Sequence, residues 1–459
     1  MAKSTPKARR YRFSARASLI GLGIELSRRR IWAPIEEKVQ IRQKTVIYTP
    51  TDKLKDGFIG MLAGAQGLVE TNKRVRPDQA LQAAFDRQGC AEQSTISETL
   101  NACTEENVAQ LGEAVKVIYR QHGAGYHHNY QERFQLLDAD TSGMPTGKKA
   151  ELSTKGYFPR QRNRRGRQLA RVVASWYDEV VVDQLYAGKV QLTQALQPLI
   201  LAAEEVLELD EAQRRRTLLR IDAGGGSEDD VNWLLARGYH LLVKDFSTKR
   251  ATRLAQSVQT WYPDTKIPGR EVGLVLQPHL YVRPTVQIAA RSRKQNGQWS
   301  YAVLICTLSP QEMLTLMSQP AELVKDSASV LLAYVHCYDK RGGGAETQVK
   351  GDRQGLGLTK RNKKKFTAQQ VLVLLGSLAH NVTIWARNWL AQTSYKLREL
   401  GILRMVRDAF QIRGRITLDQ EGRVQRITLD RRDPLAGLVG SALKILLMPG
   451  NVAINLGEI

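Results

Sequence analysis

Two apolar segments of this sequence lead directly into aspartate, and this pattern restricts the fold more than any other feature. Residues 136–142 pass from leucine into Asp138 and Asp140 before the chain turns polar, and residues 218–221 lead into Asp222. A carboxylate at the end of a buried strand is costly unless an opposite charge neutralises it. Mg²⁺ supplies such a charge, because hard cations prefer carboxylate oxygens as ligands. The pattern therefore predicts a metal site at the ends of strands.

A third acidic residue, Glu346, follows a run of glycines in a segment that we expect to be helical. Two strand aspartates and a helical glutamate suit a site that holds two cations roughly 3.5–4 Å apart, for phosphodiester cleavage and strand transfer. This order of elements is the layout of ribonuclease-H-like folds. In that layout a strand with the first aspartate is followed by further strands and a helix, a strand with the second aspartate, a β-rich insertion and the glutamate. Asp138 and Asp140 lie on one face of a strand, so on residue pattern alone either of them can be the first ligand.

The charge of the chain indicates an anionic partner. Its 459 residues carry a net charge of +23, which is typical of proteins that bind nucleic acid or an anionic membrane. No apolar run approaches the roughly 18 residues of a membrane span, and no amphipathic anchor stands out, so nucleic acid is favoured. The four cysteines form no CxxC pair and no secretory signal is recognised, so we expect a reduced, cytoplasmic protein without a zinc ribbon.

We expect an α/β chain organised in five parts. Residues 1–120 are predicted to form a basic N-terminal arm and a helical DNA-binding region, and residues 130–250 the first part of a ribonuclease-H-like mixed-sheet core. Residues 251–325 are predicted to be a β-rich insertion with a hairpin turn at Asn296 and Gly297. Residues 326–395 would complete the core with the glutamate helix, and residues 396–459 would contain a further hairpin and possible dimerisation surface.

Two stretches outside the acidic residues are candidates for DNA contact. Residues 77–103 have the order helix, short glycine-containing turn, second helix, in which the start of the second helix faces base edges. Its first residues are Gln93, Ser94 and Thr95, although a plain helical hairpin gives the same pattern. Arginines are also dense in residues 158–171, and we expect them to hold phosphates beside the metals unless they form a solvated loop; the candidates are Arg162, Arg164 and Arg165.

The chain resembles bacterial DDE transposases of the IS4-like insertion-sequence superfamily from about residue 80 to about residue 440. The resemblance is clearest at the Asp140-Thr141 dipeptide, at Asp222 with a later strand that ends in Lys244, and in a tyrosine–arginine–glutamate signature. The signature residues, with the basic residues that follow them, are Tyr338, Arg341, Glu346, Lys350 and Arg353. The gap between the arginine and the glutamate is one residue longer than is usual in the family.

The resemblance implies an enzyme that cleaves the inverted-repeat ends of an insertion sequence and joins them to target DNA. It implies two Mg²⁺ or Mn²⁺ ions bound by catalytic Asp140, Asp222 and Glu346, and it favours Asp140 over Asp138 because threonine follows directly. It also implies DNA contacts from Tyr338 and Arg341, and a homodimer on paired double-stranded DNA ends in the bacterial cytoplasm, associated with the nucleoid.

Two other interpretations of the sequence are open. A domesticated, inactive transposase would only bind DNA, and another ribonuclease-H-like nuclease, such as a resolvase, would share the acidic residues. In relatives a tryptophan of the insertion stacks on a flipped base. Trp261 and Trp299 are candidates here, although core packing is the favoured explanation for each.

Overall fold

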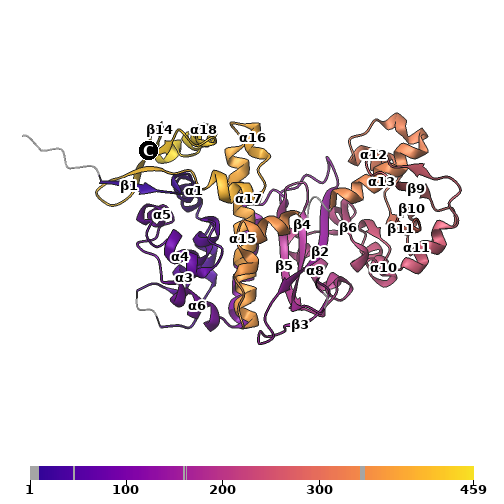
Figure 1. Ribbon diagram of the computed structural model, residues 1–459, viewed down its shortest axis with the longest axis horizontal. Helices are drawn as coiled ribbons and strands as arrows, with labels where there is room; N and C mark the ends of the chain where they lie inside the picture. The colour runs from indigo at the N-terminus through magenta and orange to yellow at the C-terminus, as the bar shows by residue number, and fades with distance from the viewer. Residues whose placement is uncertain (1–9, 45–46, 159–160, 162, 342–346) are drawn as a thin grey trace, which may run out of the picture. The chain divides into compact units, whose positions relative to one another are not determined.

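The computed structural model describes residues 10–44, 47–158, 161, 163–341 and 347–459, and the chain forms two compact units. Unit 1 comprises Met1–Gly123, Lys149–Glu151 and Gln348–Ile459, and unit 2 comprises Ala124–Lys148 and Leu152–Thr347 (Figure 1). The predicted segments 1–120 and 396–459 thus fall in one unit, and segment 326–395 is divided between the two. Within these described ranges, no helix is long and apolar enough to cross a membrane.

Unit 2 is built on a mixed sheet with the strand order β3-β4-β2-β6-β7-β11-β10-β9-β8, and β5 pairs with β4. The central strand β2 is antiparallel to β4 and parallel to β6, which in turn is parallel to β7. The mixed α/β sheet that the sequence predicts is therefore present. Its strands are β2 Gln135–Pro145, β3 Thr154–Lys155, β4 Arg165–Ala174, β5 Glu179–Ala187, β6 Thr217–Ile221, β7 His240–Lys244, β8 Tyr262–Pro263, β9 Arg270–Leu274, β10 Val286–Arg293 and β11 Trp299–Cys306.

Helices cover this sheet because its strands are apolar on both faces. All five residues of β6 are buried, and α8 packs on β4 and β5. On the other side, Leu136, Leu218 and Leu242 form one core with residues of α12 and α13. A parallel strand pair needs such cover on both faces. The helices of unit 2 are α8 Leu192–Leu207, α9 Glu211–Arg214, α10 Glu228–Ala236, α11 Thr248–Ala255, α12 Pro310–Leu316 and α13 Ser327–Arg341.

Local sequence signals account for the turns of unit 2. β10 and β11 form the predicted hairpin, and Gly297 takes the positive φ of +80° that its turn requires. Ser309 and Glu312 form the capping box expected from their spacing, with Pro310 as the first residue of α12. Within segment 251–325 the structure has the strands β8 to β11, which belong to the same sheet as β7.

Unit 1 combines helices with a four-stranded sheet of order β1-β12-β13-β14. The longest helix, α15, has the bounds that its apolar pattern predicts, Phe366–Leu390. The other elements are β1 Arg10–Ser14, α1 Ala17–Arg28, α2 Ala33–Lys38, α3 Pro50–Leu62, α4 Leu68–Arg74, α5 Gln79–Ala84, α6 Gln93–Ala102, α7 Glu105–His122, α14 Thr347–Gln354, α16 Tyr395–Arg398, α17 Ile402–Arg404, β12 Gly414–Leu418, β13 Val424–Asp430, α18 Ala436–Leu446 and β14 Ala453–Gly457.

Residues 10–38 of the predicted basic arm contain a strand and two helices. β1 pairs with β12, and most of α1 is buried. Arg28 and Arg29 both bind the buried carboxylate of Glu25 at 2.6 Å, so these two cations neutralise a charge of their own helix. Part of the positive charge of this region is therefore structural.

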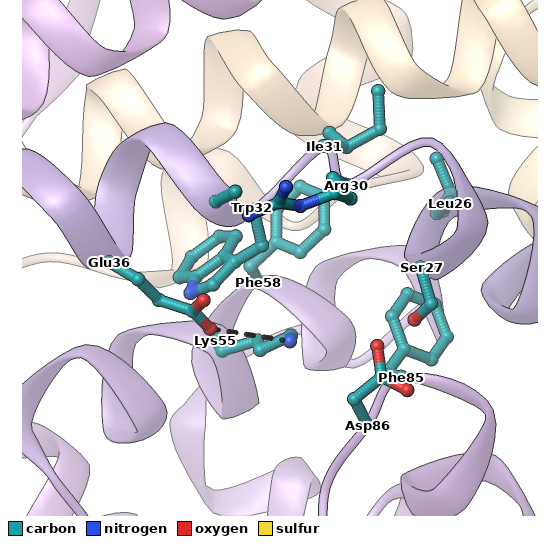
Figure 2. A pocket seen from close by; sticks show the side chains of 11 residues that line it. Leu26, Ser27, Arg30, Ile31, Trp32, Glu36, Lys55, Phe58, Phe85 and Asp86 are labelled. Atoms are coloured by element: carbon teal, nitrogen blue, oxygen red, sulfur yellow. Dashed lines mark ion pairs between the residues drawn. The ribbon is translucent and has the colours of Figure 1, made fainter.

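A pocket of about 150 Å³ lies among the helices of unit 1 (Figure 2). Its walls include the rings of Trp32 and Phe58, whose centroids are 5.3 Å apart, and the side chain of Lys55, which lies 3.7 Å from Glu36. The lining residues all belong to the segment 1–120 that is predicted to bind DNA, but none of them is one of the individually named candidate site residues.

Candidate active site

The register of the sheet brings the two aspartates of the sequence pattern together. In the parallel pair of β2 and β6, Asp138 lies opposite Arg220 and Ala139 lies opposite Ile221. Asp140 and Asp222 occupy the next position of the same register, on strands that neighbour each other at about 4.8 Å. Only Asp222 ends its strand, because β2 continues to Pro145 alongside β4. The sequence predicted that both aspartates end strands. This is correct for Asp222, whereas Asp140 lies within its strand.

A tight turn holds Asp222. Its Oδ1 accepts a hydrogen bond of 2.7 Å from the backbone N–H of Gly224 at the start of a short 3-10 turn. A Cβ atom on Gly226 would lie 2.1 Å from the carbonyl oxygen of Lys244, so only glycine allows the turn to approach β7 this closely. The glycine run therefore serves the strand-to-helix turn, and Ser227 caps α10 directly after it.

Asp140 is bound by an arginine from α13. Its Oδ2 accepts from Arg341 Nη1 at 3.0 Å, and its Oδ1 accepts from the backbone N–H of Thr141 at 2.7 Å. Burial raises the pKa of Asp140 to about 6; the positive charge of Arg341 opposes the rise, and the negative charge of Asp222 adds to it. The raised pKa means that the ionised carboxylate of Asp140 is unfavourable in this environment, and a cation bound beside it would stabilise the ionised form.

Asp138 has a different environment, although it lies two residues away on the same strand. Its two oxygens accept from Arg220 Nε and Nη2 at 2.6 Å and 2.7 Å, and Ser175 Oγ donates to it at 2.7 Å. Arg220 Nη1 donates in turn to the carbonyl oxygen of Cys337 on α13 at 2.7 Å. Asp138 is fully buried. Both oxygens of the Asp138 carboxylate are used by this bidentate ion pair. Asp140, in contrast, binds Arg341 and lies beside Asp222.

The signature residues Tyr338 and Arg341 lie on the last turn of α13. The Arg341 guanidinium is 5.5 Å from the centre of the Tyr338 ring, and burial raises the pKa of Tyr338 to about 12. Arg341 is only 7% exposed, and its Nε has no hydrogen-bond partner in the part of the chain that the structure describes. The arginine predicted to touch DNA thus binds a predicted metal ligand here.

The remaining predicted site residues are dispersed. Glu346 and Arg162 lie outside the described residues. Arg164 is exposed, and Arg165 donates from Nη1 to the carbonyl oxygen of Ser153 at 3.1 Å. Lys350 is exposed on α14 in unit 1, where Arg353 is half-buried. Unit 2 therefore brings together four of the predicted residues, which are Asp140, Asp222, Tyr338 and Arg341.

The residues of the predicted helix-turn-helix begin a helix as expected. α6 starts at Gln93, so Gln93, Ser94 and Thr95 form its first turn, and all three are half-buried. The backbone N–H of Gln93 donates to Asn72 Oδ1 on α4 at 3.0 Å. The position at the start of a helix is confirmed, and DNA contact by these residues stays a prediction.

Both candidate tryptophans of the insertion contact the same arginine. The guanidinium of Arg291 lies 4.2 Å from the ring centre of Trp261 and 4.4 Å from that of Trp299. Arg291 also pairs with Glu271 across the β9–β10 register. The two rings are half-buried, so neither is a plain core tryptophan.

Sequence reasoning missed the arginine that anchors Asp138. Arg220 interrupts the apolar run of β6, and a cation in a strand that is buried on both faces needs a partner. The same signal marks Arg171, which stands opposite Asp140 on β4 and binds Asp183 with two contacts of 2.7 Å. An arginine inside an otherwise apolar strand therefore predicts a buried ion pair, and this signal could have been used at the sequence level.

The oxygen donors of Asp140 and Asp222 fit a hard divalent cation. Each carboxylate oxygen that accepts one hydrogen bond keeps a further lone pair. Burial, which raises the pKa of Asp140, disfavours its charged form, and a nearby cation would favour that form. Among the described residues, no group of three or more histidine, cysteine, aspartate or glutamate side chains is arranged to hold a metal ion. The predicted third ligand, Glu346, is outside that set.

Comparison with known proteins finds a likeness in structure and none in sequence. No family model matches the chain, and no curated protein matches its sequence. Among solved structures, the chain is similar to piggyBac transposase in a synaptic complex with hairpin DNA, with a TM-score of 0.39 and 13% sequence identity over 94% of this chain and 82% of that one. A likeness of this size carries no conclusion about the activity of this chain.

Proposed function

We propose that this chain is a DDE transposase of the IS4-like type, which cleaves insertion-sequence ends and joins them to target DNA with two divalent cations. The observation that carries the proposal is the in-register placement of Asp140 and Asp222 on neighbouring parallel strands, with Arg341 of the signature bound to Asp140. The order of the strands supports a ribonuclease-H-like core, since β5, β4 and β2 form an antiparallel meander that continues into parallel β6 and β7.

The residues present would divide the work as follows. Asp140 and Asp222, with Glu346 as the predicted third ligand, would hold Mg²⁺ or Mn²⁺, which activate water or a 3′-hydroxyl and stabilise the leaving oxygen. Arg341 holds the Asp140 carboxylate in place through Oδ2. The turn around Gly224 fixes the Asp222 carboxylate through Oδ1. A rigid support of this kind suits a reaction whose ligand geometry must hold within fractions of an ångström.

DNA recognition in this proposal comes from both units. Tyr338, Arg164 and Arg165 would contact the cleaved end, and so would Arg341, whose Nε has no hydrogen-bond partner among the described residues. Lys350 and Arg353 of α14 and the first turn of α6 would contact the flanking duplex. Two copies would act on paired ends in the bacterial cytoplasm. The net charge of +23 supports a DNA partner.

The proposal is tested by cleavage of a labelled duplex that carries the element's own terminal repeat. Wild-type protein should cut at the repeat end with Mg²⁺ and not after chelation with EDTA. Asp222→Asn should keep its affinity for the duplex and lose cleavage. If wild type binds the duplex but does not cut it with any divalent metal, the chain is a DNA-binding protein and the proposed activity is wrong. If Asp222→Asn cuts as fast as wild type, the metal site lies elsewhere.

A further inference from the structure

The outer face of the four-stranded sheet in unit 1 carries exposed aromatic rings. Tyr11 and Phe13 on β1 are 51% and 69% exposed. They point to the same side, because side chains two apart on a strand share a face. Phe13 lies opposite Arg415 of β12, and Arg415 lies opposite Thr428 of β13. An exposed phenylalanine beside an exposed tyrosine on a sheet surface calls for a physical reason.

The sheet has one buried and one open face. Ile416, Ile427 and Leu429 are fully buried on the opposite side, against α1 and α18. The aromatic side also carries Arg426 and Asn455, which are exposed. The core of unit 1 is therefore complete without Tyr11 and Phe13, and both rings are free to act at the surface.

Arginines surround the two rings. The Arg415 guanidinium is 5.7 Å from each ring centre, and its Nε has no hydrogen-bond partner within the described ranges. Arg426 is exposed on the same face, and it forms no ion pair with any carboxylate among the residues that the structure describes. Elsewhere in unit 1, arginines such as Arg28 and Arg87 are matched with acidic partners. Positive charge without an acidic partner is thus present beside the exposed rings.

We propose that Tyr11, Phe13, Arg415 and Arg426, here called the aromatic platform, bind unpaired bases of single-stranded nucleic acid. Aromatic rings on a sheet surface stack with bases whose faces are uncovered, and nearby guanidinium groups bind the phosphates. The rings stand about 6.6 Å apart along β1, which is enough for two bases of an extended strand. Duplex DNA gains little from such rings, because its base faces are already covered by stacking.

This inference does not rest on the carboxylates of unit 2 and adds a second kind of nucleic-acid contact to the protein. Any process that opens or nicks duplex DNA produces unpaired segments, and the aromatic platform would hold them. DNA and RNA offer the same base faces, so the identity of the sugar is decided by experiment.

The test measures fluorescence anisotropy of the full-length protein in EDTA with labelled oligothymidylate and oligouridylate of about 16 nucleotides, and with a duplex of equal length. Each of Tyr11→Ala and Phe13→Ala should weaken binding of the single strand roughly 5- to 100-fold, and the double variant at least about 25-fold. Phe13→Trp should retain binding. Arg426→Gln should lower the slope of log affinity against log salt by about 0.7.

Tyr395→Ala is the matched control, because Tyr395 is 70% exposed in unit 1 and lies on α16 rather than on the sheet. Its affinity for the single strand should equal that of wild type, and duplex affinity should be unchanged in all variants. Weaker binding of both oligonucleotides by the platform variants supports the proposal. Weaker binding of oligothymidylate alone supports it with DNA as the ligand. Single-strand binding that survives the double variant overturns it, as does a double variant that changes only the oligomeric state.

Discussion

Asp138→Ala is expected to lower the free energy of unfolding of unit 2 by about 3–5 kcal/mol. Asp138 is fully buried and Arg220 is 2% exposed, and the two share a bidentate ion pair. Removal of the carboxylate leaves the Arg220 guanidinium in the core with only the Cys337 carbonyl oxygen as a known acceptor among the described residues. Urea denaturation followed by far-UV circular dichroism measures the loss as a lower transition midpoint.

Two variants separate this explanation from a general sensitivity of the fold. Glu211→Ala removes an equally short ion pair with Arg215, but both side chains are about two-thirds exposed, so the expected loss is below about 1 kcal/mol. Asp138→Leu combined with Arg220→Met removes both charges and should recover much of the stability, because an apolar pair of similar size often replaces a buried ion pair without loss. A double variant as unstable as Asp138→Ala would contradict the ion-pair explanation.

Hydrophobic periodicity in the sequence predicted most elements of the fold. The apolar pattern of residues 366–390 gives the bounds of α15, and the strand-forming runs around Leu218, Leu242 and Val303 correspond to β6, β7 and β11. These elements depend on which faces are buried, and that information is local in the chain. Capping signals at Ser227 and Ser309 are local for the same reason.

Pairings between distant segments were not predictable from the sequence. β1 pairs with β12, so Phe13 meets Arg415 across some 400 residues, and no local pattern specifies that register. The same holds for Asp138 and Arg220, whose ion pair depends on the alignment of β2 with β6. The sequence placed both aspartates on one face of a strand, but only the register decides which of them meets Arg220 and which meets Asp222.

The raised pKa of Asp140 makes the stability of unit 2 dependent on pH. Because its pKa of about 6 in the folded chain exceeds the ordinary value of 3.8, the folded state holds a proton that the unfolded state releases first. The free energy of unfolding is therefore highest, as far as Asp140 is concerned, below about pH 4. It falls as the pH rises to about 6 and remains lower above that pH. The unfavourable charge at neutral pH amounts to about 2–3 kcal/mol.

Asp140→Asn is therefore expected to stabilise the protein while it abolishes cleavage. Asparagine keeps an oxygen that can accept from Arg341, and it carries no charge, so unfolding at pH 7.5 should require about 2 kcal/mol more than in wild type, with no gain near pH 4. Cleavage of the repeat-end duplex should fall at least about 1000-fold, because a neutral amide binds Mg²⁺ poorly. Urea unfolding across this pH range and single-turnover cleavage measure the two effects.

The two substitutions are thus expected to have opposite effects on stability, since Asp138→Ala lowers it and Asp140→Asn raises it. A gain of stability together with a loss of cleavage would show that the Asp140 carboxylate serves the reaction, whereas that of Asp138 serves the fold. Equal destabilisation by both substitutions would show that Asp140 is also a structural residue.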